Sequence, residues 1–96
     1  MSEIVGRAVR VLNERIEGKS MPGSVKFVIE EEGAVRIDGT EARADDAPAD
    51  CTMTASADTF EGILDGSLNP TAAFMSGRLK VEGDMGLAIK LGTILG

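Results

Sequence analysis

The end of the chain restricts the fold most, because residues 85–95 carry only two polar side chains, Lys90 and Thr93. The apolar side chains of this stretch point in nearly every direction of a helical wheel, whereas a surface helix normally has a single apolar stripe. A chain of 96 residues has little interior in which to enclose a terminal helix on all sides. We therefore expect one face of this helix to pack on a sheet and the other to meet a ligand, a partner subunit or a membrane surface.

The beginning of the chain predicts an ordinary amphipathic helix over residues 3–17. Its apolar residues recur at every fourth position, at Ile4, Ala8, Leu12 and Ile16. Charged residues occupy the opposite side, so this segment is interpreted as a scaffold helix that packs on a sheet.

The middle of the chain alternates with the period of β-strands. Residues 25–30 and 35–37 predict a hairpin, and residues 41–44, 51–55 and 78–82 predict three further strands. Two short helices are expected, one after the N-cap Ser56 and one after Asn69-Pro70, an N-cap followed by proline. Strands that cluster early and helices that cluster late indicate a single α+β domain over residues 1–96.

Helices should cover one face of this sheet, and the other face should be wet. The polar residues that suggest the wet face are Lys26, Arg36, Thr52, Thr54 and Lys80.

The residue types that are absent exclude most chemistry. The chain has no histidine and one cysteine, which removes the common catalytic triads, CxxC motifs and the usual zinc ligands. The acidic loop Asp45 to Asp50 does not follow the spacing of an EF-hand loop. Cys51 is interpreted as a small buried thiol, since no neighbouring base would lower its pKa. We therefore expect no enzyme activity, no cofactor and no metal site.

Charge also limits the partners. The net charge is −6, which argues against nucleic acid, and the three aromatic residues are all phenylalanines. The charge is uneven, because residues 1–66 hold seven bases and fourteen acids while residues 67–96 hold three bases and two acids. The last third of the chain is thus nearly neutral and apolar. With no secretory signal and no span-length apolar run, we expect a cytoplasmic protein.

Residues 69–91 carry a specific resemblance. They read Asn-Pro, two residues, then Ala-Phe-Met-Ser-Gly-Arg-Leu-Lys-Val-Glu-Gly-Asp-Met-Gly-Leu-Ala-Ile-Lys-Leu. This resembles the C-terminal pattern of the sterol carrier protein 2 family, N-P-x-x-A-F-M-x-G-[KR]-[LI]-K-[IV]-x-G-[DN]-M-[GA]-L-A-x-K-L. The resemblance covers essentially the whole chain, strongly from Asp50 onward and weakly before it.

The resemblance implies a five-stranded mixed, mostly antiparallel sheet that helices cover on one face. It implies an apolar tunnel between sheet and helices for sterols, fatty acids, acyl-CoA or phospholipids, and no catalysis. The function implied is lipid binding and transport. The residues expected to line this tunnel are Phe27, Ile29, Val35, Ile37, Met53, Phe60, Leu64, Phe74, Met75, Leu79, Met85, Leu87, Leu91 and Leu95.

Two departures from the family refine this expectation. The chain ends in Ile94-Leu95-Gly96, not in a peroxisomal targeting tripeptide. The connection between the first two strands and the loop from Asp45 to Asp50 are also short. The tunnel mouth should therefore differ from that of the animal proteins, and an acyl chain is a better expectation than a sterol.

The alternative is an interaction or dimerisation module that uses the apolar C-terminal helix and has no ligand. We expect a monomer or weak homodimer that contacts a membrane surface transiently. Lys80 and Lys90 could meet a lipid head group, although solvent exposure is the simpler interpretation. Asp84 is interpreted as the N-cap of the last helix and not as part of an anion site.

Overall fold

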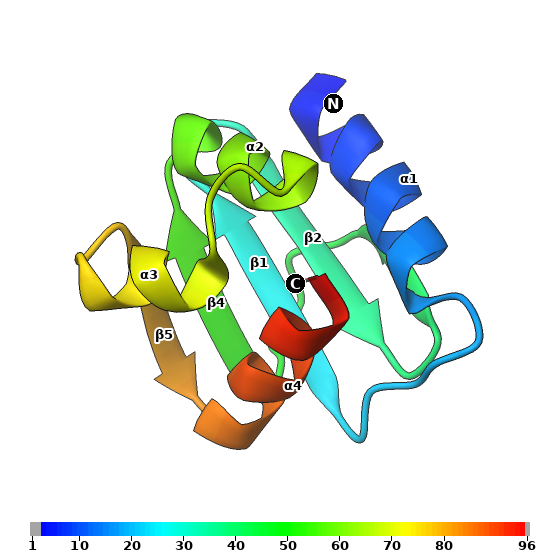
Figure 1. The fold of residues 1–96 in the computed structure, drawn as a ribbon. Helices are drawn as coiled ribbons and strands as arrows, with labels where there is room; N and C mark the ends of the chain where they lie inside the picture. Colours follow the sequence, from blue (N-terminus) through cyan, green and yellow to red (C-terminus); the bar gives the residue numbers. More distant parts are fainter. Residues whose placement is uncertain (1–2, 96) are drawn as a thin grey trace.

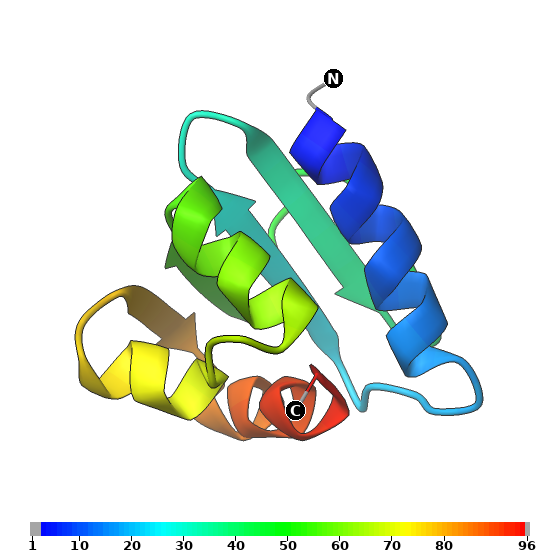
Figure 2. The ribbon, with the colours of Figure 1, turned by 45° about the horizontal axis from the view of Figure 1, so that its top comes forward.

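The computed structural model describes residues 3–95 as five strands in one sheet, with four helices on one of its faces (Figures 1 and 2). The elements, in chain order, are α1 (Glu3–Ile16), β1 (Ser24–Ile29), β2 (Gly33–Asp38), β3 (Glu41–Ala44), β4 (Cys51–Ala55), α2 (Ala57–Asp65), α3 (Pro70–Met75), β5 (Leu79–Gly83) and α4 (Met85–Leu95). These bounds lie within two residues of those that the sequence periodicity predicts.

The sheet has the strand order β3-β2-β1-β4-β5. β1 and β4 are parallel, and the other three pairs of neighbours are antiparallel. The register places Phe27 of β1 opposite Val35 of β2 and Met53 of β4. Because side chains alternate across a strand, these three residues point to the same face, toward the helices. The predicted mixed, mostly antiparallel sheet is confirmed.

The helices begin at the residues that the sequence indicates. Ser56 Oγ accepts a hydrogen bond from the Thr59 N–H, and Asn69 Oδ1 accepts from the Thr71 N–H at 2.8 Å. Asp84 Oδ1 accepts from the Gly86 N–H at 2.8 Å, directly before α4. Its carboxylate therefore satisfies free N–H groups of the first turn, which confirms that Asp84 acts as the cap.

The last helix packs one of its faces on the sheet and leaves the other open. Leu87, Leu91 and Ile94 are buried, whereas Ile89, on the opposite side of the helix, is exposed. The first half of the expectation for this helix is thus confirmed.

The second face of the sheet is less exposed to solvent than predicted, because the loop between β3 and β4 crosses it. β3 is an edge strand and β4 is a central one, so residues 45–50 must pass over β2 and β1. They do so on the side away from the helices, behind the sheet in Figure 1. Arg36 Nε donates to Pro48 O at 3.2 Å, and Lys26 Nζ forms an ion pair with Asp46 at 3.2 Å. The Lys26 and Arg36 side chains are therefore largely covered, which corrects the prediction for these two residues.

The junction before α4 is crowded. Gly83 has a φ of +92°, and a Cβ added to it would lie 2.4 Å from the carbonyl oxygen of Asp50. The same oxygen accepts a hydrogen bond from the Asp84 N–H at 3.0 Å, and the Asp50 carboxylate accepts from the Ser24 N–H and hydroxyl. Asp50 thereby ties the start of β1 to the end of β5 and the start of α4. Only glycine fits at position 83 without strain.

Candidate functional site

The candidate site is the apolar layer between the sheet and the helices. Its centre is the contact between Phe27 of β1 and Phe60 of α2, whose ring centroids are 4.4 Å apart with the planes tilted by 60°. Both side chains are fully buried. Tilted pairs of this kind contribute about 0.5–1.5 kcal/mol beyond the area they bury.

Most residues predicted to contact a ligand lie in this layer. The buried ones come from four strands and two helices, and they are Phe27, Ile29, Val35, Ile37, Met53, Phe60, Leu64, Leu79, Leu87 and Leu91. The structure thus brings together residues that are up to 64 positions apart, from Phe27 to Leu91. Whether they line a bound lipid stays a prediction.

Three predicted site residues lie elsewhere. Phe74, Met75 and Met85 are exposed, so the structure does not place them in the buried layer. The physical reason is that α3 has only six residues, of which Ala73 alone is buried. α3 therefore turns its larger side chains outward. Leu95 ends α4, but its side chain is outside the described part of the structure.

The layer is closed to solvent, because its side chains are buried. Among residues 3–95, no buried side-chain nitrogen or oxygen lacks a hydrogen-bond partner. The surface carries shallow grooves of about 320 to 750 Å³, and the predicted ligand-binding residues line none of the five described. A ligand could therefore enter between sheet and helices only if the elements around the layer moved apart.

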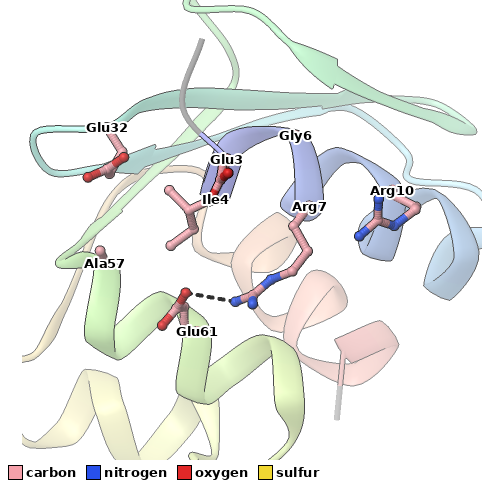
Figure 3. A pocket seen from close by; sticks show the side chains of 8 residues that line it. All are labelled: Glu3, Ile4, Gly6, Arg7, Arg10, Glu32, Ala57 and Glu61. Atoms are coloured by element: carbon pink, nitrogen blue, oxygen red, sulfur yellow. Dashed lines mark hydrogen bonds and ion pairs between the residues drawn. The ribbon is translucent and has the colours of Figure 1, made fainter.

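The largest of these grooves, of about 750 Å³, lies between the start of α1 and α2 (Figure 3). Arg7 and Glu61 approach each other across it and form an ion pair at 2.8 Å. Both side chains are nearly half exposed, so the pair contributes no more than about 1 kcal/mol. Ile4 and Ala57 also line the groove and pack against the buried core. The groove is thus a polar-rimmed depression above the apolar layer.

Sequence reasoning missed this groove. Arg7 and Glu61 lie 54 residues apart, and the only local signal is the charged stripe of α1, which fits any solvated helix face equally well.

The carboxylates of the acidic loop, residues 45–50, form hydrogen bonds and ion pairs with other residues of the protein. The Asp45 carboxylate accepts a hydrogen bond from the Ala47 N–H and contacts Arg43, and both interactions lower the pKa of Asp45. Asp46 pairs with Lys26, and Asp50 with Ser24. Within residues 3–95 no group of three or more His, Cys, Asp or Glu residues is arranged to hold a metal ion. None of the described helices has the length and hydropathy that crossing a membrane requires.

Cys51 starts β4 and is buried. Burial raises the pKa of its thiol above the ordinary value of 9.0, and the negative charge of Asp84 raises it further. The neutral thiol is the poorer nucleophile, so Cys51 is an inert core residue.

We expect Cys51 to react with a thiol reagent much more slowly in the folded protein than in urea.

The raised pKa of Cys51 also makes stability depend on pH. Because the pKa of the thiol is higher in the folded protein, the unfolded chain loses this proton first as the pH rises. The contribution of Cys51 to the free energy of unfolding is therefore complete below pH 9.0 and is lost above it. Urea titrations across this range should show that decline, and the Cys51→Ala variant should show less of it. Equal labelling rates with and without urea would contradict the predicted low reactivity of the folded thiol.

The strand order and the one-sided helical layer define a class of small α+β domains, the sterol-carrier fold. The model of the SCP-2 sterol transfer family matches residues 5–96, and the chain belongs to this family.

Curated relatives are much longer proteins. The chain is 37% identical over 98 residues to hydroxysteroid dehydrogenase-like protein 2 of Xenopus tropicalis, covering 94% of this chain and 24% of that protein. It is 48% identical over 46 residues to human sterol carrier protein 2, covering 48% of this chain and 8% of that protein. The chain thus spans about a quarter or less of the length of these relatives.

Solved structures share the fold. The sterol carrier protein domain 2 of Helicoverpa armigera has a TM-score of 0.77 and 25% identity, covering 96% of this chain and 85% of that one. Sterol carrier protein 2 of Aedes aegypti, solved in complex with palmitate, has a TM-score of 0.80 and 20% identity, covering 100% and 97%.

Proposed function

We propose that this protein binds a lipid with a single acyl chain between its sheet and helices and carries it without catalysis. The observation that carries the proposal is the continuous apolar layer in a member of the SCP-2 sterol transfer family. Its driving force would be removal of the chain from water, about 0.8 kcal/mol per methylene. The palmitate complex of the Aedes aegypti protein supports an acyl chain as the ligand class.

Binding in this layer requires the helices to move, since the layer is closed to solvent. α4 is suited to such movement because only one of its faces packs on the rest of the protein, while Ile89 on the other face is exposed. α2 is suited as well, since an exposed ion pair links it to α1 across the groove. The core side chains that would move include Met53, whose flexible thioether adapts to variable shapes.

Native mass spectrometry of the freshly purified protein, followed by lipid extraction, tests this function. We expect an extra mass of a few hundred daltons, an order of magnitude set by one acyl lipid in a pocket of this kind. Palmitate added to delipidated protein should restore a one-to-one complex. The matched control is the same protein with a short-chain acid such as butyrate, which offers too few methylenes to bind.

A ligand-free monomer that also refuses palmitate and acyl-CoA would overturn the proposal. Some longer relatives are named as dehydrogenase-like proteins, and the sterol-carrier domain is only part of their length. We propose that, in a protein of that kind, the sterol-carrier domain would hold or supply the lipid, and the rest of the protein would carry out the chemistry.

A further inference from the structure

The two outer edges of the sheet differ in how their backbone groups are bonded. β3 is the edge strand on one side and β5 on the other (Figure 1). At the β3 edge, the side-chain amide of Asn13 in α1 accepts a hydrogen bond from the Ala42 N–H at 2.8 Å and donates one to Ala42 O at 2.9 Å. α1 thus covers this edge, which is one of the ways in which proteins prevent an edge strand from pairing with another chain.

The β5 edge has no such cover. The Asp84 N–H donates to Asp50 O at 3.0 Å, in register with the antiparallel β4–β5 ladder. Because the backbone groups of an antiparallel strand point alternately toward and away from its neighbour, the even-numbered residues of β5 bond β4. The N–H and C=O of Val81, at the centre of β5, therefore point away from the sheet. No side chain or loop within residues 3–95 bonds them.

The side chains on either side of Val81 carry opposite charges without partners. Lys80 and Glu82 are both exposed, and neither forms an ion pair with another described residue. Their cross-strand neighbours in β4 are Thr54 and Thr52, which are uncharged. The edge thus presents a positive and a negative side chain on one face of the sheet, two residues apart.

This charge pattern is complementary to itself. In an antiparallel pair of two β5 strands centred on Val81, Lys80 of each copy lies opposite Glu82 of the other. These are the non-hydrogen-bonded positions of the new ladder, where facing side chains come closest and opposite charges stabilise the pair. A parallel pair in the same register would instead bring like charges together.

We propose that two copies of this chain pair through β5 and form one continuous sheet. The Val81 N–H of each copy donates to Val81 O of the other across a two-fold axis, as expected for an interface between identical surfaces. Val81 also packs against the core on the helix side of the sheet, so the two apolar layers meet at this axis. The inference does not depend on the proposed lipid function, because the contact uses the edge of the sheet.

The dimer should be weak. A five-residue edge buries less area than the ~800 Å² that each partner contributes to a stable dimer. We expect a dissociation constant on the order of 100 μM, which sedimentation equilibrium between about 10 μM and 1 mM measures. Val81→Pro should abolish the dimer, because proline has no N–H to donate at the centre of the pair and is tolerated in an edge strand.

Charge exchange tests the register. Lys80→Glu and Glu82→Lys should each weaken self-association about tenfold, because two attractive pairs become repulsive. An equimolar mixture of these two variants should associate at least as well as the parent protein, since every facing pair is then opposite in charge. The matched control is Lys19→Glu, the same change at an exposed lysine outside the sheet, which should leave self-association unchanged.

Each outcome decides for or against the β5 interface. A parent protein that stays monomeric up to 1 mM overturns the proposal. So does a dimer that Val81→Pro and both charge variants leave intact, or a mixture of Lys80→Glu and Glu82→Lys that associates no better than either variant alone. Circular dichroism checks that the variants fold, and the two charge variants alter only exposed side chains if Val81→Pro does not.

Discussion

Replacement of Phe60 by alanine is expected to lower the free energy of unfolding by about 3–5 kcal/mol. Phe60 is fully buried, and its ring centroid lies 4.4 Å from that of Phe27. Truncation therefore leaves a cavity in the middle of the layer between sheet and helices. A domain of this size has a total stability on the order of 5–14 kcal/mol. The variant would therefore lose a large share of its stability, which urea denaturation followed by circular dichroism measures.

The matched control for this change is Phe74→Ala, which removes the same atoms from a ring that is 43% exposed. We expect it to cost less than about 1.5 kcal/mol, because much of the ring already contacts water. Equal losses for the two variants would contradict the burial described for Phe60. If Phe60→Ala is too unstable to purify, Phe60→Leu, with a smaller expected loss, gives the same comparison against Phe74→Leu.

The second large effect is expected at the junction before α4. Gly83→Ala should lower the free energy of unfolding by about 4 kcal/mol, because the new Cβ meets the backbone oxygen of Asp50 at 2.4 Å. A backbone atom cannot rotate away as a flexible side chain can. Either β4 and β5 must separate or α4 must tilt from the sheet. Thermal and urea unfolding measure the loss.

Gly77→Ala separates steric overlap from backbone strain. Gly77 has a φ of +81°, close to the +92° of Gly83, but a Cβ added there meets nothing within 4 Å. This variant should lose only the cost of the left-handed conformation, about 1–2 kcal/mol. Similar losses at both positions would show that the Asp50 contact is not a strong constraint.

The elements of the fold were predictable because each follows a local rule. The alternation of Val25, Phe27 and Ile29 and the cap at Asn69-Pro70 fix a strand and a helix start without reference to the rest of the chain. The order of the strands has no such local signal. The family resemblance of residues 69–91 implies a mixed five-stranded sheet and most of the buried members of the candidate site, but not the strand order, which comes from the structure.

What could not be predicted depends on packing between distant segments. Phe74 and Leu91 are both apolar residues on helices, and only the short length of α3 and its position over an edge strand leave Phe74 exposed. The coverage of Arg36 required the knowledge that β3 is an edge strand and β4 a central one. The groove at Arg7 and Glu61 likewise exists only where α1 meets α2.

The crossing of residues 45–50 over the back of the sheet has a consequence for how the chain folds. β1, β2 and β3 pair with their neighbours in sequence, so their meander needs only local contacts. The parallel β1–β4 ladder joins residues 26 positions apart, such as Phe27 and Met53, and requires the loop to lie over strands already in place. Because contacts of long sequence separation form slowly, we expect β4 to dock after the meander. The second half of the chain, which holds α4, would then assemble late, so a folding protein would expose its most apolar helix until β4 has docked.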